Sequence, residues 1–263
     1  MTRTHISFSE LKIWNECAFK HKLTYIDEVK SFLGNEYTAF GTAVHEVCEK
    51  SVLDEIDQNF ETLNECFNNK FLKELKSLTD KNVELNKDLV KKMRNQAYAL
   101  LPYIIPVLKE NFTEYEVFSA EEKLYEVLED TSLKFKGYID LVIKTPDQKY
   151  HIIDWKTCSW GWDSKKKADR MTTYQLTLYK HFFALKHGID PKNIETHFAL
   201  LKRTAKTKKV EIFRVTSGPK KTENAINLLN KAIYNIKSKN FIKNRLSCTQ
   251  GFGCEFYKTE HCR

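Results

Sequence analysis

The chain has 263 residues, of which 41% are hydrophobic and 30% are charged, and its formal net charge is +8. This is the composition of a globular protein, with no apolar run long enough to cross a membrane. Its length favours a single domain over residues 1–263, and Met1-Thr-Arg-Thr does not begin a secretory signal. We therefore expect a cytoplasmic protein in a reducing compartment, where a framework of disulfides does not form.

The first part of the chain is predicted to be helical. One helix is expected from Ser7 to Ile26, opened by a capping box of Ser7 and Glu10, and another from about Phe40. Residues from about 51 to 112 contain no convincing strand, so we predict an all-helical insertion there.

The second part is predicted to alternate between strands and helices. Turns at Glu129-Asp130 and at Thr145-Pro-Asp-Gln148 separate three successive antiparallel strands. A helix, two more strands and a last helix follow. The predicted ranges in chain order are strands at 115–128, 133–143 and 150–155, a helix at 168–187, strands at 194–202 and 209–215, and a helix at 220–239.

Two carboxylates and a lysine lie at the tips of two adjacent predicted strands. Asp140 ends Gly137-Tyr-Ile-Asp140, and Asp154 and Lys156 follow within Asp154-Trp-Lys156-Thr. Metal-assisted phosphodiester hydrolysis requires this combination, because carboxylates hold hard divalent ions that polarise the phosphate, while a lysine orients the water or offsets charge. Each motif is short enough to occur by chance, and solvated side chains at strand ends are the alternative.

Two further motifs flank this pair. Gly41-Thr-Ala-Val-His45 lies upstream and Gln175-x-x-x-Tyr179 lies downstream. In this order the motifs resemble the PD-(D/E)XK nuclease superfamily, specifically its RecB-like branch, over most of the chain. The resemblance implies an α/β fold with a restriction-endonuclease-like core, in which helices flank a central mixed sheet.

The resemblance also implies a role for each motif residue. His45, Asp140, Asp154 and the backbone carbonyl of Trp155 would bind the catalytic Mg²⁺ or Mn²⁺, and the nitrogen ligand would favour Mn²⁺. The implied catalytic residues are Asp140, Asp154, Lys156, Gln175 and Tyr179.

Alternatives remain for the residues outside the central pair. Gln175 and Tyr179 share one helix face and could reach the lysine or a DNA phosphate, or could form the polar edge of a packed helix. His45 could be a structural histidine. The family often places an acidic residue before the hairpin, and the sequence does not distinguish Glu121 from Glu122.

The seven cysteines of the chain are its second strong signal. Cys48, Cys66 and Cys158 are expected to behave as small buried hydrophobes. In a reducing compartment, clustered cysteines are typical of metal sites. One cysteine in the first predicted helix and three at the C-terminus form the candidate set, namely Cys17, Cys248, Cys254 and Cys262.

This cysteine layout resembles that of iron-sulfur RecB-like nucleases, including the AddB nuclease domain and the CRISPR-associated adaptation nucleases, and implies a 4Fe-4S cluster. In those proteins two C-terminal cysteines lie two residues apart and the third follows five later, whereas here five residues separate Cys248 from Cys254 and seven separate Cys254 from Cys262. A four-thiolate Zn²⁺ site is therefore the alternative, with His261 as a substitute ligand. Either metal would join the first helix to a C-terminal clasp at residues 240–263.

Basic and aromatic side chains follow the strand of Lys156 and the next strand pair. Basic loops there would contact phosphates without reading bases, and indole rings could stack on unpaired bases. Solvated charge and packing against the sheet are the alternatives, and for Trp155 we expect packing. The predicted DNA-binding residues are Trp160, Trp162, Lys165, Lys166, Lys167, Arg170, Lys202 and Arg203.

The sequence thus predicts a metal-dependent deoxyribonuclease, an exonuclease that acts on DNA ends or single strands in recombination, repair or replication. No Gly-x-x-x-x-Gly-Lys-Ser/Thr motif occurs, so a helicase or recombination partner would separate the strands where this is needed. The size is like that of phage or mobile-element enzymes of the family. A structure-specific endonuclease and a non-catalytic DNA-binding subunit are the competing hypotheses.

Overall fold

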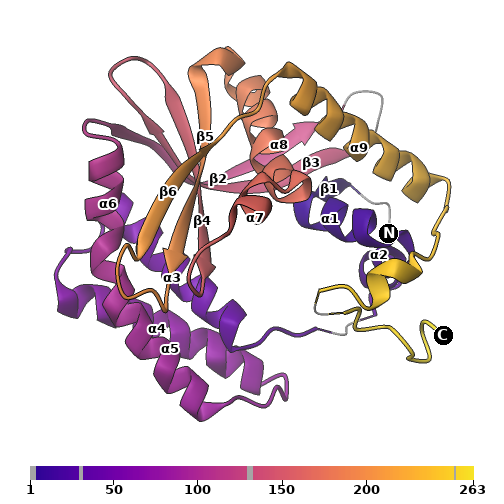
Figure 1. Ribbon diagram of the computed structural model, residues 1–263, viewed down its shortest axis with the longest axis horizontal. Coiled ribbons are helices and arrows are strands. Elements are labelled where there is room, and N and C mark those ends of the chain that lie inside the picture. The colour runs from indigo at the N-terminus through magenta and orange to yellow at the C-terminus, as the bar shows by residue number, and fades with distance from the viewer. Residues whose placement is uncertain (1–3, 30–31, 129–132, 252) are drawn as a thin grey trace. The chain divides into compact units, whose positions relative to one another are not determined.

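The computed structural model describes residues 4–29, 32–128, 133–251 and 253–263 (Figure 1). The chain divides into two compact units. The first unit comprises Met1–Leu33, Tyr125–Gly137 and Gly218–Arg263, and the second comprises Gly34–Leu124 and Tyr138–Ser217. All the catalytic residues implied by the motifs lie in the second unit, and the four candidate cysteine ligands lie in the first.

The first unit begins with a short strand and two short helices. These are β1 (His5–Ser7), α1 (Phe8–Glu16) and α2 (Ala18–Tyr25), so the prediction of one helix from 7 to 26 is wrong. Cys17 breaks it, because this residue is extended and its sulfur caps α2 by accepting the backbone N–H of Lys20. The predicted capping box is half formed, since Ser7 accepts the N–H of Glu10 while the Glu10 carboxylate binds His21 at 2.7 Å.

The C-terminal part of the chain also belongs to the first unit. Helix α9 (Pro219–Lys237) matches the predicted last helix, and a 3-10 turn, η3 (Arg245–Cys248), follows it. In the C-terminal segment after η3, the side chain of Phe256 is buried, with 2% of the residue exposed. The backbone of this segment also folds on itself, because Cys254 donates to the carbonyl of Cys248.

Helices of the second unit occupy most of residues 51–112. They are α3 (Glu36–Val52), α4 (Phe60–Thr79), α5 (Lys87–Leu100), a 3-10 turn η1 (Leu101–Tyr103) and α6 (Ile104–Asn111). A capping box of Asn35 and Thr38 starts α3 four residues before the predicted position. Phe40, Phe67 and Phe71 centre an apolar core that these helices share with one face of the sheet.

The sheet is mixed, as predicted, and contains six strands. Beside β1 these are β2 (Glu116–Val127), β3 (Lys134–Lys144), β4 (Tyr150–Cys158), β5 (Ile194–Lys202) and β6 (Val210–Val215). The order is β1-β3-β4-β5-β6, with β2 paired to β3. Strands β3 and β4 are antiparallel, β4 and β5 parallel, and β5 and β6 antiparallel (Figure 1). Of the two predicted turns, Glu129-Asp130 lies outside the described residues, whereas the turn after Thr145 joins β3 to β4.

Two helices carry the chain from β4 across to the parallel β5. They are α7 (Ser164–Ala168) and α8 (Arg170–His187), separated by Asp169, which caps α8. Alternate residues of a strand face opposite sides of a sheet. On β4, Ile153 and Trp155 accordingly enter the core shared with α3–α6, whereas Asp154 points to α8. None of the described helices combines the length and apolarity needed to span a membrane.

Candidate active site

Asp140 and Asp154 lie at the end of the β3–β4 ladder. Their neighbours Leu141 and Ile153 are register partners, so the two aspartates are the next residues on facing strands. The Asp140 carboxylate accepts the backbone N–H of Trp155 at 2.7 Å through Oδ2. This bond fixes the Asp140 side chain against β4.

Asp154 is a buried carboxylate, with 1% of the residue exposed. Its Oδ1 accepts a hydrogen bond of 2.9 Å from Gln175, and Lys156 Nζ lies 2.6 Å from its Oδ2. The buried Oδ2 thus has the Lys156 ammonium as its ion-pair partner, although the angles of this contact are not those of a regular hydrogen bond. Burial raises the pKa of Asp154 to about 6, and the neighbouring Asp140 adds to the rise while Lys156 opposes it.

Lys156 is the cation of the site. Burial alone would lower the pKa of its ammonium, but the charges of Asp154 and Asp140 raise that pKa above its ordinary value. The side chain keeps 30% of its surface exposed. Lys156 is therefore positively charged at neutral pH and still accessible to a bound molecule.

A second group of potential ligands lies beside the aspartates. One oxygen or nitrogen from each of His45, Glu121 and Asp140 lies within 4.8 Å of the other two, and His45 Nδ1 is 3.6 Å from Asp140 Oδ1. Glu121 is an exposed residue, but partial burial of its carboxylate, followed by the charge of Asp140, raises its pKa to about 7. Strongly perturbed pKa values beside a partner charge are typical of functional sites.

The backbone of β2 decides which of the two adjacent glutamates joins this group. Glu121 has a φ of 47°, a left-handed conformation that is rare for a residue other than glycine. Glu122 instead accepts hydrogen bonds from Ser119, Lys186 and His187. Glu121 is thus the glutamate that lies with His45 and Asp140.

Gln175 and Tyr179 share one face of α8, as their spacing predicts. The side-chain amide of Gln175 donates to Asp154 and also, at 3.3 Å, to the hydroxyl of Tyr179. Burial and then the charge of Asp154 raise the pKa of Tyr179 to about 12. The described hydrogen bonds of Gln175 therefore hold Asp154, and do not reach Lys156.

Trp155 packs as expected, since its side chain is 1% exposed and belongs to the core. Trp160, in contrast, is 78% exposed in the loop after β4. Trp162 packs against Phe198 and Phe213, at ring distances of 5.1 and 6.2 Å. Of the two loop tryptophans, only Trp160 presents most of its ring to solvent.

The predicted basic residues fall into two groups. Lys165 and Lys166 on α7 and Arg170 at the start of α8 are exposed. The other three have hydrogen-bond or ion-pair partners within the protein: Lys167 and Lys202 both pair with Glu211, and Arg203 donates to Gln96 and Ser159.

The four candidate cysteine ligands line one cavity of about 110 Å³ in the first unit. The Cys17 sulfur accepts the backbone N–H of Asn244 at 3.3 Å. Four basic residues line the same cavity, namely Lys20, Lys243, Arg245 and Arg263. Of the remaining cysteines, Cys48 is fully buried, whereas Cys66 and Cys158 are only half-buried.

Comparisons with known proteins identify the family to which this chain belongs. The family model of the PD-(D/E)XK nuclease superfamily matches residues 5–259. A crystal structure titled "Putative exonuclease" from Eubacterium rectale is similar with a TM-score of 0.61 and 16% identity, covering 94% of this chain and 86% of that one. The crystal structure of SSO0001 matches with a TM-score of 0.36 and 18% identity, covering 64% of this chain and 74% of that one. A search of curated proteins found no match.

Proposed function

Because the chain belongs to the PD-(D/E)XK nuclease superfamily, we propose that it is a metal-dependent DNA exonuclease of the RecB-like branch, with its active site at Asp140, Asp154 and Lys156. The observation that carries the proposal is the cluster of His45, Glu121 and Asp140, whose ligand atoms lie within 4.8 Å of one another, with the buried Asp154 at the facing position of the next strand. Neighbouring carboxylates disfavour one another's charge, and a bound cation would offset this repulsion.

The donor set fits Mg²⁺ or Mn²⁺. Carboxylate oxygens suit both hard ions, and the imidazole of His45 adds preference for Mn²⁺. His45, Glu121, Asp140 and Asp154 would hold the ion, with the carbonyl of Trp155 as a further ligand. A divalent ion held there supplies the Lewis acidity that polarises a phosphate.

The protein's own residues prepare the site for hydrolysis. Gln175, itself bonded to Tyr179, fixes the Asp154 carboxylate. Lys156 is charged, and from its place beside Asp154 its ammonium can donate to the attacking water or to the phosphate oxygen on which negative charge develops. Such electrostatic stabilisation is commonly the largest single contribution of an active site.

DNA with free ends or single-stranded character is the proposed substrate. Trp160 offers an exposed ring for stacking on unpaired bases, and Lys165, Lys166 and Arg170 offer exposed charge for phosphates. The similarity to a structure titled "Putative exonuclease" also favours digestion from ends. We propose a role in recombination, repair or replication, with a helicase or recombination protein as partner, in the cytoplasm of a host cell and encoded by a phage or mobile element.

The test compares end-labelled linear single-stranded DNA with covalently closed circular DNA of the same sequence, each with Mg²⁺ and with Mn²⁺. Progressive shortening of the linear strand and an intact circle are expected. Cutting of the circle would show an endonuclease of the same chemistry. Binding without cleavage of either substrate would identify a non-catalytic DNA-binding protein.

For the cysteine cavity we propose a 4Fe-4S cluster that stabilises the first unit. A cluster held by four thiolates is anionic, which suits the four basic side chains around the cavity, and the N–H donated to the Cys17 sulfur stabilises a thiolate ligand. Protein purified without air should contain close to four irons per chain and be brown. A colourless protein with one zinc per chain would replace the cluster by the Zn²⁺ alternative, and a stable protein with neither metal would reject both.

A further inference from the structure

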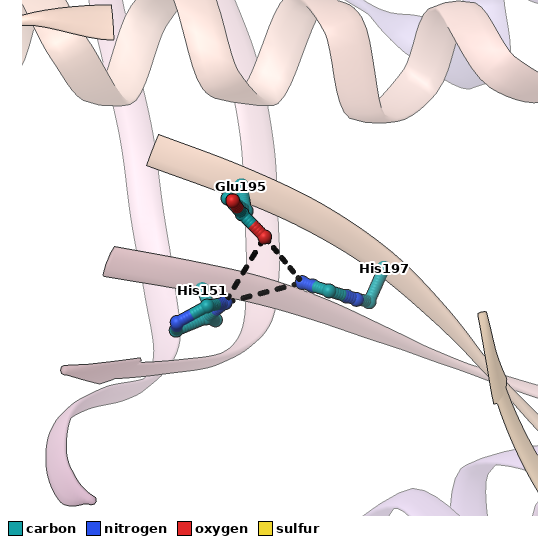
Figure 2. Close-up of side chains that lie close together, drawn as sticks. All are labelled: His151, Glu195 and His197. Carbon is teal, nitrogen blue, oxygen red and sulfur yellow. Dashed lines mark hydrogen bonds and ion pairs between the residues drawn. The ribbon is translucent and has the colours of Figure 1, made fainter. Parts of the chain in front are cut away.

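Three side chains outside the catalytic motifs converge on one point of the sheet. His151 lies on β4, and Glu195 and His197 lie on β5 (Figure 2). His151 and Glu195 are register partners in the parallel ladder, and Glu195 and His197 are two residues apart, so all three project from the same face. This is the face of Ile153 and Trp155, opposite to that of Asp154.

The three nearest ligand atoms form a compact triangle. His151 Nδ1 is 3.2 Å from His197 Nε2, and Glu195 Oε2 is 3.9 Å from the first nitrogen and 4.0 Å from the second. A point in the plane of these atoms lies about 2.2 Å from each, which is close to the Zn–N and Zn–O bond lengths of about 2.0–2.2 Å. A tetrahedral ion would need these side chains to move by only a few tenths of an ångström.

The surroundings hold these side chains in place. Both histidines are 7% exposed and pack against the ring of Phe112, at 4.9 and 5.3 Å. His151 Nε2 is 3.1 Å from the Thr145 hydroxyl, which donates to Asp147. With this hydroxyl accepting from His151 Nε2, the Nδ1 on the side of the triangle is the acceptor of the 3.2 Å hydrogen bond with His197 Nε2, and the same electron pair can bind an ion once His197 Nε2 has lost its proton. Metal-binding histidines commonly have such an outer partner.

The Glu195 carboxylate divides its two oxygens between different partners. Oε1 pairs with Arg214 at 3.2 Å and Lys149 at 3.7 Å, whereas Oε2 faces the two histidines. The two cations thus orient the carboxylate while its second oxygen remains directed into the triangle. Burial lowers the pKa of both imidazoles, that of His197 to about 3, so both rings are neutral as metal ligands must be.

We propose that His151, Glu195 and His197 bind a late transition-metal ion of the Zn²⁺ class, at a site separate from the catalytic one. Two imidazoles and one carboxylate suit such ions better than Mg²⁺ or Ca²⁺, which prefer oxygen ligands. The triangle borders a pocket of about 650 Å³, from which a water molecule can complete the coordination. Because the ligands come from two strands, the ion would cross-link β4, which carries Asp154 and Lys156, to β5.

The test counts bound Zn²⁺ per chain after equilibration with ZnCl₂ and gel filtration, in the wild type, His197→Asn, Glu195→Gln and the control His181→Asn on α8. Both triangle variants should bind one Zn²⁺ fewer than the wild type, and the control should bind the same number. Zinc should also raise the melting temperature of the wild type by roughly 5 °C more than that of Glu195→Gln. The thiol groups are intact in every protein, so zinc bound by cysteines cancels in the comparison.

Equal zinc counts in the wild type and both triangle variants would overturn the proposal. Glu195→Gln decides the matter if His197→Asn does not fold, because it nearly preserves the shape of the side chain. Cleavage of DNA with Mg²⁺ alone should change by less than about twofold in Glu195→Gln, since the triangle faces away from the aspartates. The zinc count does not depend on nuclease activity, so its outcome is separate from that of the proposed function.

Discussion

Replacing each of two adjacent glutamates with glutamine should produce different defects: Glu122→Gln should lower stability, whereas Glu121→Gln should weaken metal binding. Glu122 is 7% exposed at its side chain and accepts hydrogen bonds from Lys186 at 2.7 Å, from His187 at 2.5 Å and from Ser119. A hydrogen bond to a buried charged group contributes about 1.5–3 kcal/mol. Because Lys186 and His187 can turn to water once the charge is lost, we expect Glu122→Gln to cost about 2–3 kcal/mol, or roughly 4–8 °C in melting temperature.

The cost of Glu122→Gln should depend on pH in a definite direction. Burial alone would raise the pKa of Glu122, but the bonds from Lys186, Ser119 and His187 hold that pKa below its ordinary value. The unfolded chain therefore binds the proton more readily than the folded one, and the contribution of the carboxylate is present above about pH 4.5 and lost as the pH falls further. The difference between the wild type and Glu122→Gln should be full at pH 7 and should shrink below pH 4.5.

Glu121→Gln should leave stability unchanged or slightly raised in EDTA, because it removes a carboxylate that Asp140 repels. Its Mn²⁺ affinity should fall at least about tenfold, since even outer partners of metal ligands contribute about 10–100-fold. Thermal melts in EDTA and Mn²⁺ titration calorimetry measure the two effects. A loss of stability in Glu121→Gln with unchanged Mn²⁺ binding, or weaker Mn²⁺ binding in Glu122→Gln, would refute the reasoning.

Five further variants test the metal ligands, the loop tryptophans and the cysteines. His45→Ala should weaken Mn²⁺-dependent cleavage more than Mg²⁺-dependent cleavage, because nitrogen ligands favour Mn²⁺, and an unchanged Mn²⁺/Mg²⁺ ratio would remove His45 from the ligand set. Trp160→Ala should weaken binding of single-stranded DNA by about 5–100-fold in a fluorescence titration, whereas Trp162→Ala should cost about 1–3 kcal/mol of stability, and the reverse pattern would contradict their placement. Cys254→Ser should abolish metal binding in the cysteine cavity and lower the melting temperature, whereas Cys48→Ala should cost only about 1 kcal/mol, and equal metal content in both would exclude Cys254 as a ligand.

Much of the fold follows from periodicity in the sequence. The strands around Asp140 and Asp154 and the helix of Gln175 and Tyr179 have strong local patterns, and the structure has them within a few residues of their predicted bounds. The break at Cys17 could not be predicted in this way, because the apolar pattern continues from α1 into α2. The helix is interrupted only by the extended backbone of Cys17.

Other features depend on geometry that one sequence does not contain. Glu121 and Glu122 are alike in sequence, and they differ only in the folded chain, where Glu122 is buried among hydrogen-bond donors and Glu121 lies with His45 and Asp140. The triangle of His151, Glu195 and His197 requires the register between β4 and β5, which are parallel and joined through two helices. In the sequence, only the alternation of Glu195 and His197 on a predicted strand points to this site. Two ligands alone do not indicate a metal site, and the third, His151, comes beside them only through the pairing of β4 with β5.

The most direct test of the central claim measures DNA cleavage and DNA binding together, in Asp140→Asn and Lys156→Ala beside the wild type, with Mg²⁺ and with Mn²⁺. Asp140→Asn keeps an oxygen for the N–H of Trp155, and Lys156→Ala removes an ammonium that is partly exposed, so both variants should fold. We expect each to lose cleavage by a factor of about a thousand, because interactions made in the transition state are removed, while affinity for DNA changes by less than about threefold, because binding is spread over many phosphates. Cleavage at the wild-type rate by either variant would contradict the assignment of this site.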